Sequence, residues 1–81
     1  MGFQDEKELI RKAISKDQTA FNLLFDKYWS SVYSFLFLRT QSSNIAEELA
    51  IESFTKAFDR LDKFDHQHSF GSWLITIAKN H

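Results

Sequence analysis

The sequence contains no cysteine, no proline and only two glycines. Without cysteine, the chain can form no disulfide framework, no thiolate nucleophile and no cysteine-ligated zinc or iron–sulfur site. Without proline and with so little glycine, it lacks the residues that make the many tight turns of an all-β sandwich or barrel. These absences favour a helical fold.

Long apolar runs and a strong charge of either sign are also lacking. No stretch approaches the roughly 20 apolar residues of a membrane span, and the N-terminus has no apolar region typical of a secretory signal. The net charge of −1 and the pI near 6.3, taken alone, argue against a strongly basic nucleic-acid-binding domain. The 81 residues are therefore expected to form one cytoplasmic domain.

Aromatic residues are abundant, at 16% of the chain, with nine Phe, two Trp and two Tyr. A domain of this length has a marginal core. Large rings compensate, because each can bury about 150–250 Å² of surface. We expect most of these rings to lie in the core.

Apolar spacing and capping residues predict an all-α, compact bundle of about four helices. The first is expected over about residues 5–15, with Asp5 as its N-cap. The second begins after Asp17 and extends to about Leu38 or Arg39, with apolar residues on more than one side. Such a helix is either covered by several neighbours or offers a face to a partner.

After a polar connector, Asn44 is expected to cap a third helix. Residues 62–68 then interrupt the pattern, and Ser69 is expected to cap a fourth helix that begins near Phe70. The core-facing residues of the third helix are expected to be Ala46, Leu49, Ala50, Phe54, Ala57, Phe58 and Leu61.

The opposite side of the third helix carries Glu48, Ile51, Glu52 and Thr55 at helical spacing. Ile51 is an apolar residue on an otherwise polar side. A single surface isoleucine is common, but an apolar residue flanked by acids also suits contact with a basic helix of a partner. Residues 40–55 contain three glutamates and no Lys or Arg, which favours a basic partner.

Two Phe, one Trp and two His gather in residues 64–73. Rings beside a loop can stack on unpaired bases. The simpler explanation is that Phe70, Trp73 and their neighbours close the core. Lys79 is the only formal charge in residues 66–81, so this end has rings for bases but little charge for phosphates.

Neither a metal site nor a catalytic site is predicted. His66 and His68 lack a third ligand at a suitable spacing, and solvated loop histidines are common. The glutamates of the third helix need no catalytic role, because acids near a helix start favour the helix dipole. No glycine-rich phosphate loop, Ser–His–Asp order or nucleophile elbow occurs. We expect no cofactor and no enzymatic activity.

Three groups of residues occur in order along the chain. They are Asp17 with Ala20, Phe21, Leu24 and Tyr28; Ala46-Glu47-Glu48-Leu49 with Phe54; and Phe70, Trp73, Leu74, Ile77, Ala78 and Asn80. Together they resemble region 2 of a bacterial sigma-70 family RNA polymerase sigma factor of the extracytoplasmic function (ECF) group. The resemblance covers about residues 5–81. It implies that residues 1–81 are one region 2 domain, the N-terminal part of a longer protein, with region 4 absent from this chain.

The resemblance implies that the third helix binds the clamp helices of the polymerase β′ subunit. The family pattern there is close to A-E-D-L-x-Q-x-x-F, and this chain has Glu48 at the Asp position and Ile51 at the Gln position. The residues expected to contact RNA polymerase are Glu48, Ile51, Glu52 and Thr55.

The resemblance also implies recognition of the −10 promoter element as single-stranded non-template DNA. In this family the loop before the last helix captures a flipped base, whose extrusion costs a few kcal/mol of unstacking. The residues expected to bind DNA are Phe64, His66, Ser69, Phe70, Trp73, Thr76, Ile77 and Asn80. An anti-sigma factor is a further implied partner.

The competing explanation is a helical protein-interaction module without a DNA-binding role. Such a module would share the four helices and the exposed Ile51. It would not require the loop at residues 64–70 or Asn80 to recognise a base. These two features therefore distinguish the two functions.

Overall fold

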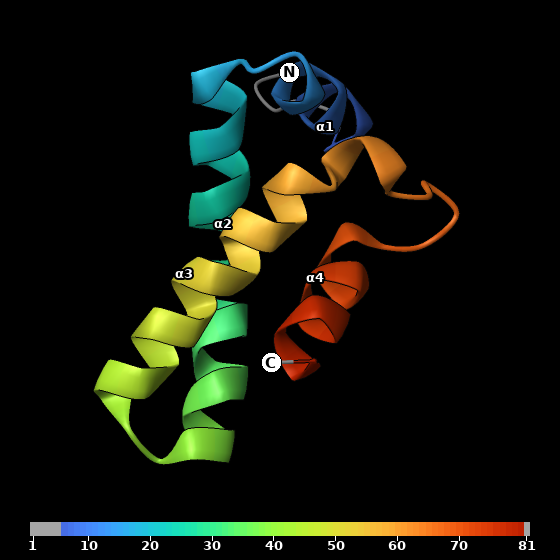
Figure 1. Cartoon of the computed structure of the whole chain (residues 1–81). Helices are drawn as coiled ribbons and strands as arrows, with labels where there is room; N and C mark the ends of the chain where they lie inside the picture. The colour runs from blue at the N-terminus through green and yellow to red at the C-terminus, as the bar shows by residue number, and fades with distance from the viewer. Residues whose placement is uncertain (1–5, 81) are drawn as a thin grey trace.

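The computed structural model describes residues 6–80, which form four α-helices and one short 3₁₀ helix. They are α1 (Glu6–Ile14), α2 (Gln18–Thr40), α3 (Ser43–Asp59), η1 (Leu61–Lys63) and α4 (Phe70–Lys79). The long helices α2 and α3 form an antiparallel pair, α1 crosses one end of this pair, and α4 packs against both (Figure 1). The predicted all-α fold is confirmed.

Side-chain caps determine where α2 and α4 begin, as the sequence predicts. The carboxylate of Asp17 accepts a hydrogen bond from the backbone N–H of Thr19 at 3.0 Å. The hydroxyl of Ser69 accepts one from the N–H of Ser72 at 3.1 Å. Each cap supplies a partner to a backbone donor that the first helical turn leaves unpaired.

The predicted start of the third helix is wrong by two residues. Ser42, not Asn44, is the N-cap of α3, and its hydroxyl accepts the N–H of Ile45 at 3.2 Å. The reason is the tight turn before it, where Gln41 ends α2 in the left-handed conformation with φ 57°. The predicted cap of the first helix, Asp5, lies outside the described residues.

The end of α1 at Ile14 agrees with the expected end at about residue 15. Lys16 adopts φ 71°, and its N–H donates to the carbonyl of Ala13 at 2.9 Å. The N–H of Asp17 then donates to the carbonyl of Lys12 at 3.0 Å. This pair of bonds is the Schellman motif, which usually has glycine at its left-handed position. Lys16 occupies that position here, so this motif carries no glycine signal in the sequence.

Small side chains on α3 allow the other helices to approach it closely. Ala46, Ala50 and Ala57 are all completely buried, and Phe54 is 2% exposed. Of the predicted core-facing residues, two are only partly buried, namely Leu49 and Phe58. Ser53, which the apolar pattern does not include, is fully buried, and its hydroxyl donates to the carbonyl of Leu49 at 2.7 Å.

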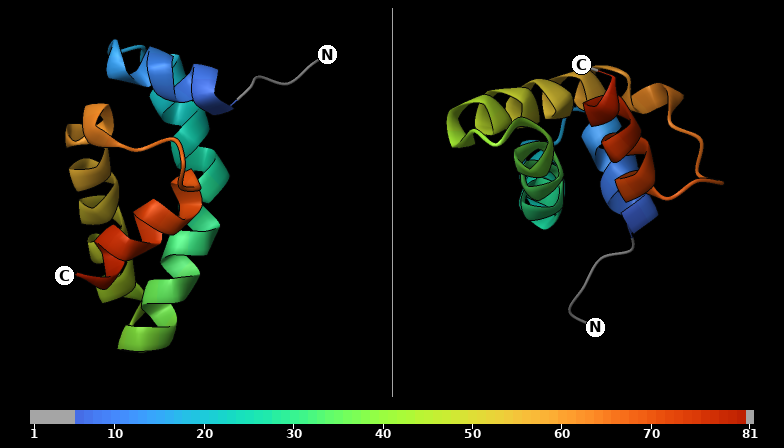
Figure 2. Two further views of the ribbon diagram at one scale, coloured as in Figure 1. Left: turned by 90° about the vertical axis from the view of Figure 1, so that its right-hand side faces the viewer. Right: turned by 90° about the horizontal axis from the view of Figure 1, so that it is seen from below.

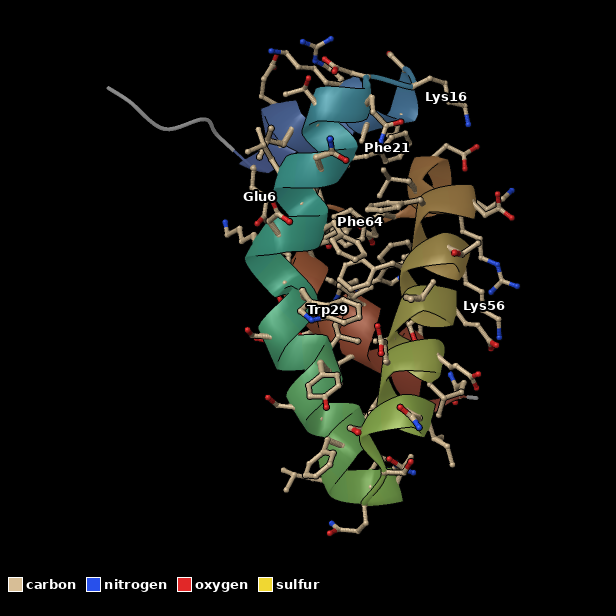
Figure 3. All side chains as sticks on the ribbon, turned by 90° about the vertical axis from the view of Figure 1, so that its left-hand side faces the viewer. Glu6, Lys16, Phe21, Trp29, Lys56 and Phe64 are labelled. Atoms are coloured by element: carbon tan, nitrogen blue, oxygen red, sulfur yellow. The ribbon has the colours of Figure 1, made fainter. Side chains whose placement is uncertain are left out.

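The aromatic residues of α2 form a ladder that faces α3. Ring centroids of Phe25 and Trp29 lie 5.1 Å apart, and those of Trp29 and Tyr33 lie 6.0 Å apart. Phe54 of α3 packs against this ladder, 4.7 Å from Phe25, and Figure 3 shows the rings between the two helices. Much of the high aromatic content therefore joins α2 to α3.

A second aromatic cluster ties the segment before α4 to the core. Phe64 is 7% exposed, and its ring centroid lies 5.6 Å from Phe70 and 5.0 Å from Trp73. The start of α4 also approaches α2 closely, because a Cβ added to Gly71 would lie only 3.1 Å from Cε1 of Tyr28. The loop at residues 64–70 therefore leaves the bundle at one side but returns to a fixed point (Figure 2).

Polar contacts join α1 to α2. Nζ of Lys27 lies 2.9 Å from Oε2 of Glu6, and the Tyr28 hydroxyl donates a hydrogen bond to the same oxygen. Burial raises the pKa of Glu6, but the bonds from Tyr28 and Lys27 outweigh that effect, so the pKa lies below its ordinary value. Burial and the neighbouring carboxylate raise the pKa of Tyr28. Among residues 6–80, no helix has both the length and the apolar character needed to cross a bilayer.

The burial of Phe64 predicts a large cost for removing its ring. Phe64→Ala should lower the free energy of unfolding by about 3–5 kcal/mol, because it removes apolar contacts and leaves a cavity. Urea unfolding followed by circular dichroism measures this change. Phe37→Ala is the matched control, since Phe37 is 38% exposed and should cost only about 1 kcal/mol. Equal effects of the two substitutions would contradict the packing described for Phe64.

The lowered pKa of Glu6 predicts a pH-dependent contribution to stability. A carboxyl whose pKa is lower in the folded state stabilises the fold above its unfolded pKa, and this contribution is lost as the pH falls through the folded pKa. Glu6→Gln should therefore destabilise the domain at pH 7 by under about 1 kcal/mol. As the pH falls through the folded pKa of Glu6, the urea midpoints of the variant and the wild type should converge. A difference that grows towards low pH would have the wrong sign.

Candidate functional site

The outer side of α3 forms the first candidate surface. Glu48, Ile51, Glu52 and Thr55 are all exposed, and 49% of Ile51 is accessible. The Thr55 hydroxyl donates to the carbonyl of Ile51 at 3.0 Å, and this bond fixes the orientation of the Thr55 side chain on the helix. The four residues thus lie together on the side of α3 opposite its buried alanines, as the spacing predicts.

The charge of this surface is uniformly negative along most of the helix. From Ser43 to Thr55, α3 carries three exposed glutamates and no basic residue, and Lys56 is the first basic residue. Ile51 lies among these acids as an exposed apolar side chain. An acidic surface with one apolar contact point suits a partner that is basic and helical.

The second candidate surface combines the loop at residues 64–70 with α4. Of the predicted DNA-binding residues, the exposed ones are His66, Ser69, Thr76 and Asn80. Trp73 and Ile77 are partly buried against the core. The loop is ordered by Asp65, whose carboxylate accepts the N–H of Gln67 at 2.9 Å and whose carbonyl accepts the N–H of His68 at 3.0 Å. Asp65 thus makes an Asx-turn that turns both histidines outward.

The expectation that Phe64 offers its ring for stacking on a base is wrong, whereas Phe70 closes the core, as the simpler explanation from the sequence has it. Phe70 is 1% exposed and Phe64 is 7% exposed, so neither face of either ring is open to a base. The physical reason is the small core, which gains more from burying these rings than a loop gains from displaying them. Their place in the site is structural, beneath the residues that are exposed.

Two hollows flank this loop. One, of about 270 Å³, lies between α1 and the loop, and the other, of about 240 Å³, lies beside α4. The first is lined by Glu6, Lys7, Ile10, Phe64, His66, His68, Ser69 and Phe70. The second is lined by His68, Ser72, Trp73 and Thr76. Both hollows are smaller than the pockets that usually hold drug-sized ligands.

Sequence reasoning missed the contribution of α1 to this site. Glu6 and Lys7 are far from the loop in sequence, and only the packing of α1 against η1 and α2 brings them to the hollow. No sequence signal marks this contact. In the same part of the structure, His66 and His68 belong to no group of three His, Cys, Asp or Glu side chains that could hold a metal, as judged over residues 6–80.

The family model described as Sigma-70 region 2 matches residues 24–81 of this chain. BldN, an ECF RNA polymerase sigma factor of Streptomyces coelicolor, is 38% identical over 74 residues, which cover 90% of this chain and 28% of BldN. SigW, an ECF RNA polymerase sigma factor of Bacillus subtilis, is 32% identical over 74 residues, covering 91% of this chain and 40% of SigW. The chain therefore spans well under half of the length of these two relatives.

Two solved structures are similar to this one. The complex of RsbN with BldN gives a TM-score of 0.82 at 35% identity and covers 88% of this chain and 52% of that chain. An engineered region 2 of sigmaE in complex with GTAAAA gives a TM-score of 0.87 at 32% identity and covers 99% of this chain and 83% of that chain. The helices, their order and the sequence agree with one family: this chain belongs to the sigma-70 region 2 family, within the ECF group of RNA polymerase sigma factors.

Proposed function

We propose that this domain recognises the −10 promoter element as single-stranded DNA through the loop at residues 64–70 and α4, and binds the β′ clamp helices of RNA polymerase through the outer side of α3. The observation that carries the proposal is the similarity to an engineered sigmaE region 2 solved with GTAAAA, which extends over 99% of this chain. The exposed polar residues of the loop and α4 are consistent with contact to such a strand.

On the DNA-binding side, the chemistry favours base contacts over phosphate contacts. His66, Ser69, Thr76 and Asn80 supply hydrogen-bonding groups, and an asparagine can both donate to and accept from a base edge. Lys79 is the only Lys or Arg from residue 66 onward. Since phosphate contacts supply much of the affinity of nucleic-acid binding, the isolated domain should bind DNA weakly and depend on polymerase to hold it there.

On the polymerase-binding side, the support is the combination of negative charge and an exposed isoleucine. Family members usually have Gln at the position of Ile51, so a hydrogen bond to the clamp helices would be replaced here by apolar contact. Glu48 and Glu52 flank this position one turn apart and would face basic groups of the partner.

A further proposed partner is an anti-sigma factor. BldN, which is similar to this chain, has been solved in complex with RsbN, so a domain of this shape can form a stable complex with a second protein. Selection of a complete promoter would require segments of a longer protein, in keeping with the greater length of the relatives. The proposed place of action is the cytoplasm, where polymerase works.

The alternative, a protein-interaction module without a DNA-binding role, would use the same α3 surface. It leaves the Asx-turn of the loop and its exposed histidines without a purpose. Binding of single-stranded DNA that depends on base identity separates the two functions, because a pure interaction module has no reason to distinguish bases.

Ile51→Asp should weaken binding to the β′ clamp helices about tenfold, because it removes an apolar contact and places a charge at that point of the interface. Folding should be nearly unchanged because Ile51 is exposed. Titration of the isolated clamp-helix fragment by fluorescence anisotropy measures the affinity.

Leu23→Asp is the matched control for this experiment. Leu23 is 45% exposed, close to the 49% of Ile51, but lies on α2. It should bind the fragment like the wild type. If Ile51→Asp and Leu23→Asp both retain wild-type affinity, the outer side of α3 is not the polymerase-binding surface.

Asn80→Ala should reduce binding of a single-stranded −10 oligonucleotide about fivefold to tenfold and should relax the preference for one base, since one base-edge contact is lost. The measurement is made with the full-length factor bound to polymerase, so that weak binding by the isolated domain does not obscure it. Asn44→Ala, an exposed asparagine on α3, is the control and should have no effect. A loss of affinity that is equal for all bases would contradict direct recognition by Asn80.

A further inference from the structure

A groove of about 520 Å³ lies between α2 and α4, and it is larger than either hollow beside the loop. Val32, which is 1% exposed, lies at its floor, and the partly buried Tyr28 and Ile75 give it apolar walls. The rest of the lining is small or polar, and consists of Ser31 on α2 and of Ser69, Gly71, Ser72, Thr76 and Lys79 at or on α4. The groove thus combines hydroxyl groups and one cation with a limited apolar surface.

Negative charge is absent from the lining of this groove. The stretches of chain that form it, residues 27–46 and 66–81, contain no Asp or Glu, although the whole chain contains 11 such residues. Glu6 binds the Tyr28 hydroxyl, but it does not line the groove and pairs with Lys27 at 2.9 Å. A negatively charged ligand therefore meets no carboxylate on the walls.

Three donors in the groove are left for a ligand. Within residues 6–80, the hydroxyl of Ser31 and the ammonium of Lys79 make no hydrogen bond or ion pair. The hydroxyl of Ser72 accepts a hydrogen bond from Ser69 at 2.9 Å, so its own proton remains to be donated. Thr76 is not one of the three, because its hydroxyl already donates to the carbonyl of Ser72 at 2.9 Å. Donors from two helices that line one space suit an anion.

A phosphate ester fits this set of donors. Ser72 and Lys79 are seven residues apart and thus lie on one side of α4, and helical side chains such as Lys79 lean towards the N-terminus, here towards Ser72. The oxygens of a phosphate accept from several donors at once. The groove is larger than one phosphate fills, and Tyr28 with Ile75 offers an apolar wall to an attached sugar.

We infer that the groove between α2 and α4 is a phosphate-binding site, in which Ser31, Ser72 and Lys79 donate hydrogen bonds to the phosphate group of a sugar phosphate. Two sources supply such a group: the backbone of single-stranded DNA and a free sugar phosphate. The first source rests on the proposed DNA-binding function, whereas the second does not. A site with one lysine adds modest affinity, which agrees with weak DNA binding by the isolated domain.

The test uses the 81-residue chain at low ionic strength and two probes without bases. One is a fluorescein-labelled abasic deoxyribose-phosphate hexamer, followed by anisotropy. The other is ribose 5-phosphate, followed by chemical-shift changes of the backbone amides, with ribose as the matched ligand that lacks the phosphate. The wild type should bind at least one probe and should not bind ribose.

Two variants and two matched controls identify the site. Ser31→Ala should weaken binding about threefold and Lys79→Gln about fivefold, because each removes one donor. For the abasic hexamer, Lys79→Gln should also reduce the slope of log K against log salt concentration by about 0.7, whereas Ser31→Ala should leave it unchanged. Ser30→Ala and Lys56→Gln should behave like the wild type, since both residues are exposed and neither lines the groove.

Each outcome separates the site from the proposed function. Binding of the hexamer alone assigns the site to a DNA strand, and binding of ribose 5-phosphate alone assigns it to a free sugar phosphate. If the wild type binds neither probe, or if Ser31→Ala and Lys79→Gln both bind like the wild type, the inference is overturned. The DNA-binding function is judged by the base-containing −10 oligonucleotide. A factor that binds this oligonucleotide with a base preference, but neither abasic probe, keeps that function and loses the phosphate site.

Discussion

The packing of the Phe64 ring against Phe70 and Trp73 is the contact on which the arrangement of the loop at residues 64–70 and α4 depends. A chain of 81 residues has few side chains available for a core, and these rings fill the space between the loop and α4. Because the ring of Phe64 is fixed, the loop that follows begins and ends at set points. The Phe64 ring lines the hollow beside α1 together with the loop histidines and Ser69.

The two candidate surfaces use different chemistry because different elements build them. On α3 a regular helix presents acids and one isoleucine at fixed spacing, and the alanines on its other side bind it tightly to the bundle. At the second candidate surface, the exposed polar groups come from a loop, from one side of α4 and from the start of α1. A rigid, charged surface suits another folded protein, whereas exposed hydrogen-bonding groups suit the edges of single bases.

The sequence predicts the regular parts of this fold well. The helices carry their own signals in apolar period and caps, so α2, α4 and the exposure of Ile51 follow directly from spacing. It fails where the deciding contact is not local. Ser42 and Asn44 are both good caps, and only the left-handed turn at Gln41 selects between them.

The same limit explains the errors at the site. In a loop without a period, nothing in the sequence says whether the ring of Phe64 points inward or outward, and the demand of the core decides it. Glu6 was missed for a related reason. Its place beside the loop depends on the docking of α1 through Lys27 and Tyr28, residues more than 20 positions away.

Tyr28 has a consequence for how sequences of this kind can diverge. Its hydroxyl binds Glu6 on α1, while the edge of its ring leaves no room for a Cβ at Gly71 without adjustment. The Tyr28 side chain thus restricts which residues fit at positions 6 and 71, which are 65 residues apart in the sequence. Among related sequences, a smaller residue at position 28 should therefore accompany larger residues at position 71 and a lost acid at position 6, so that the three positions change as a set.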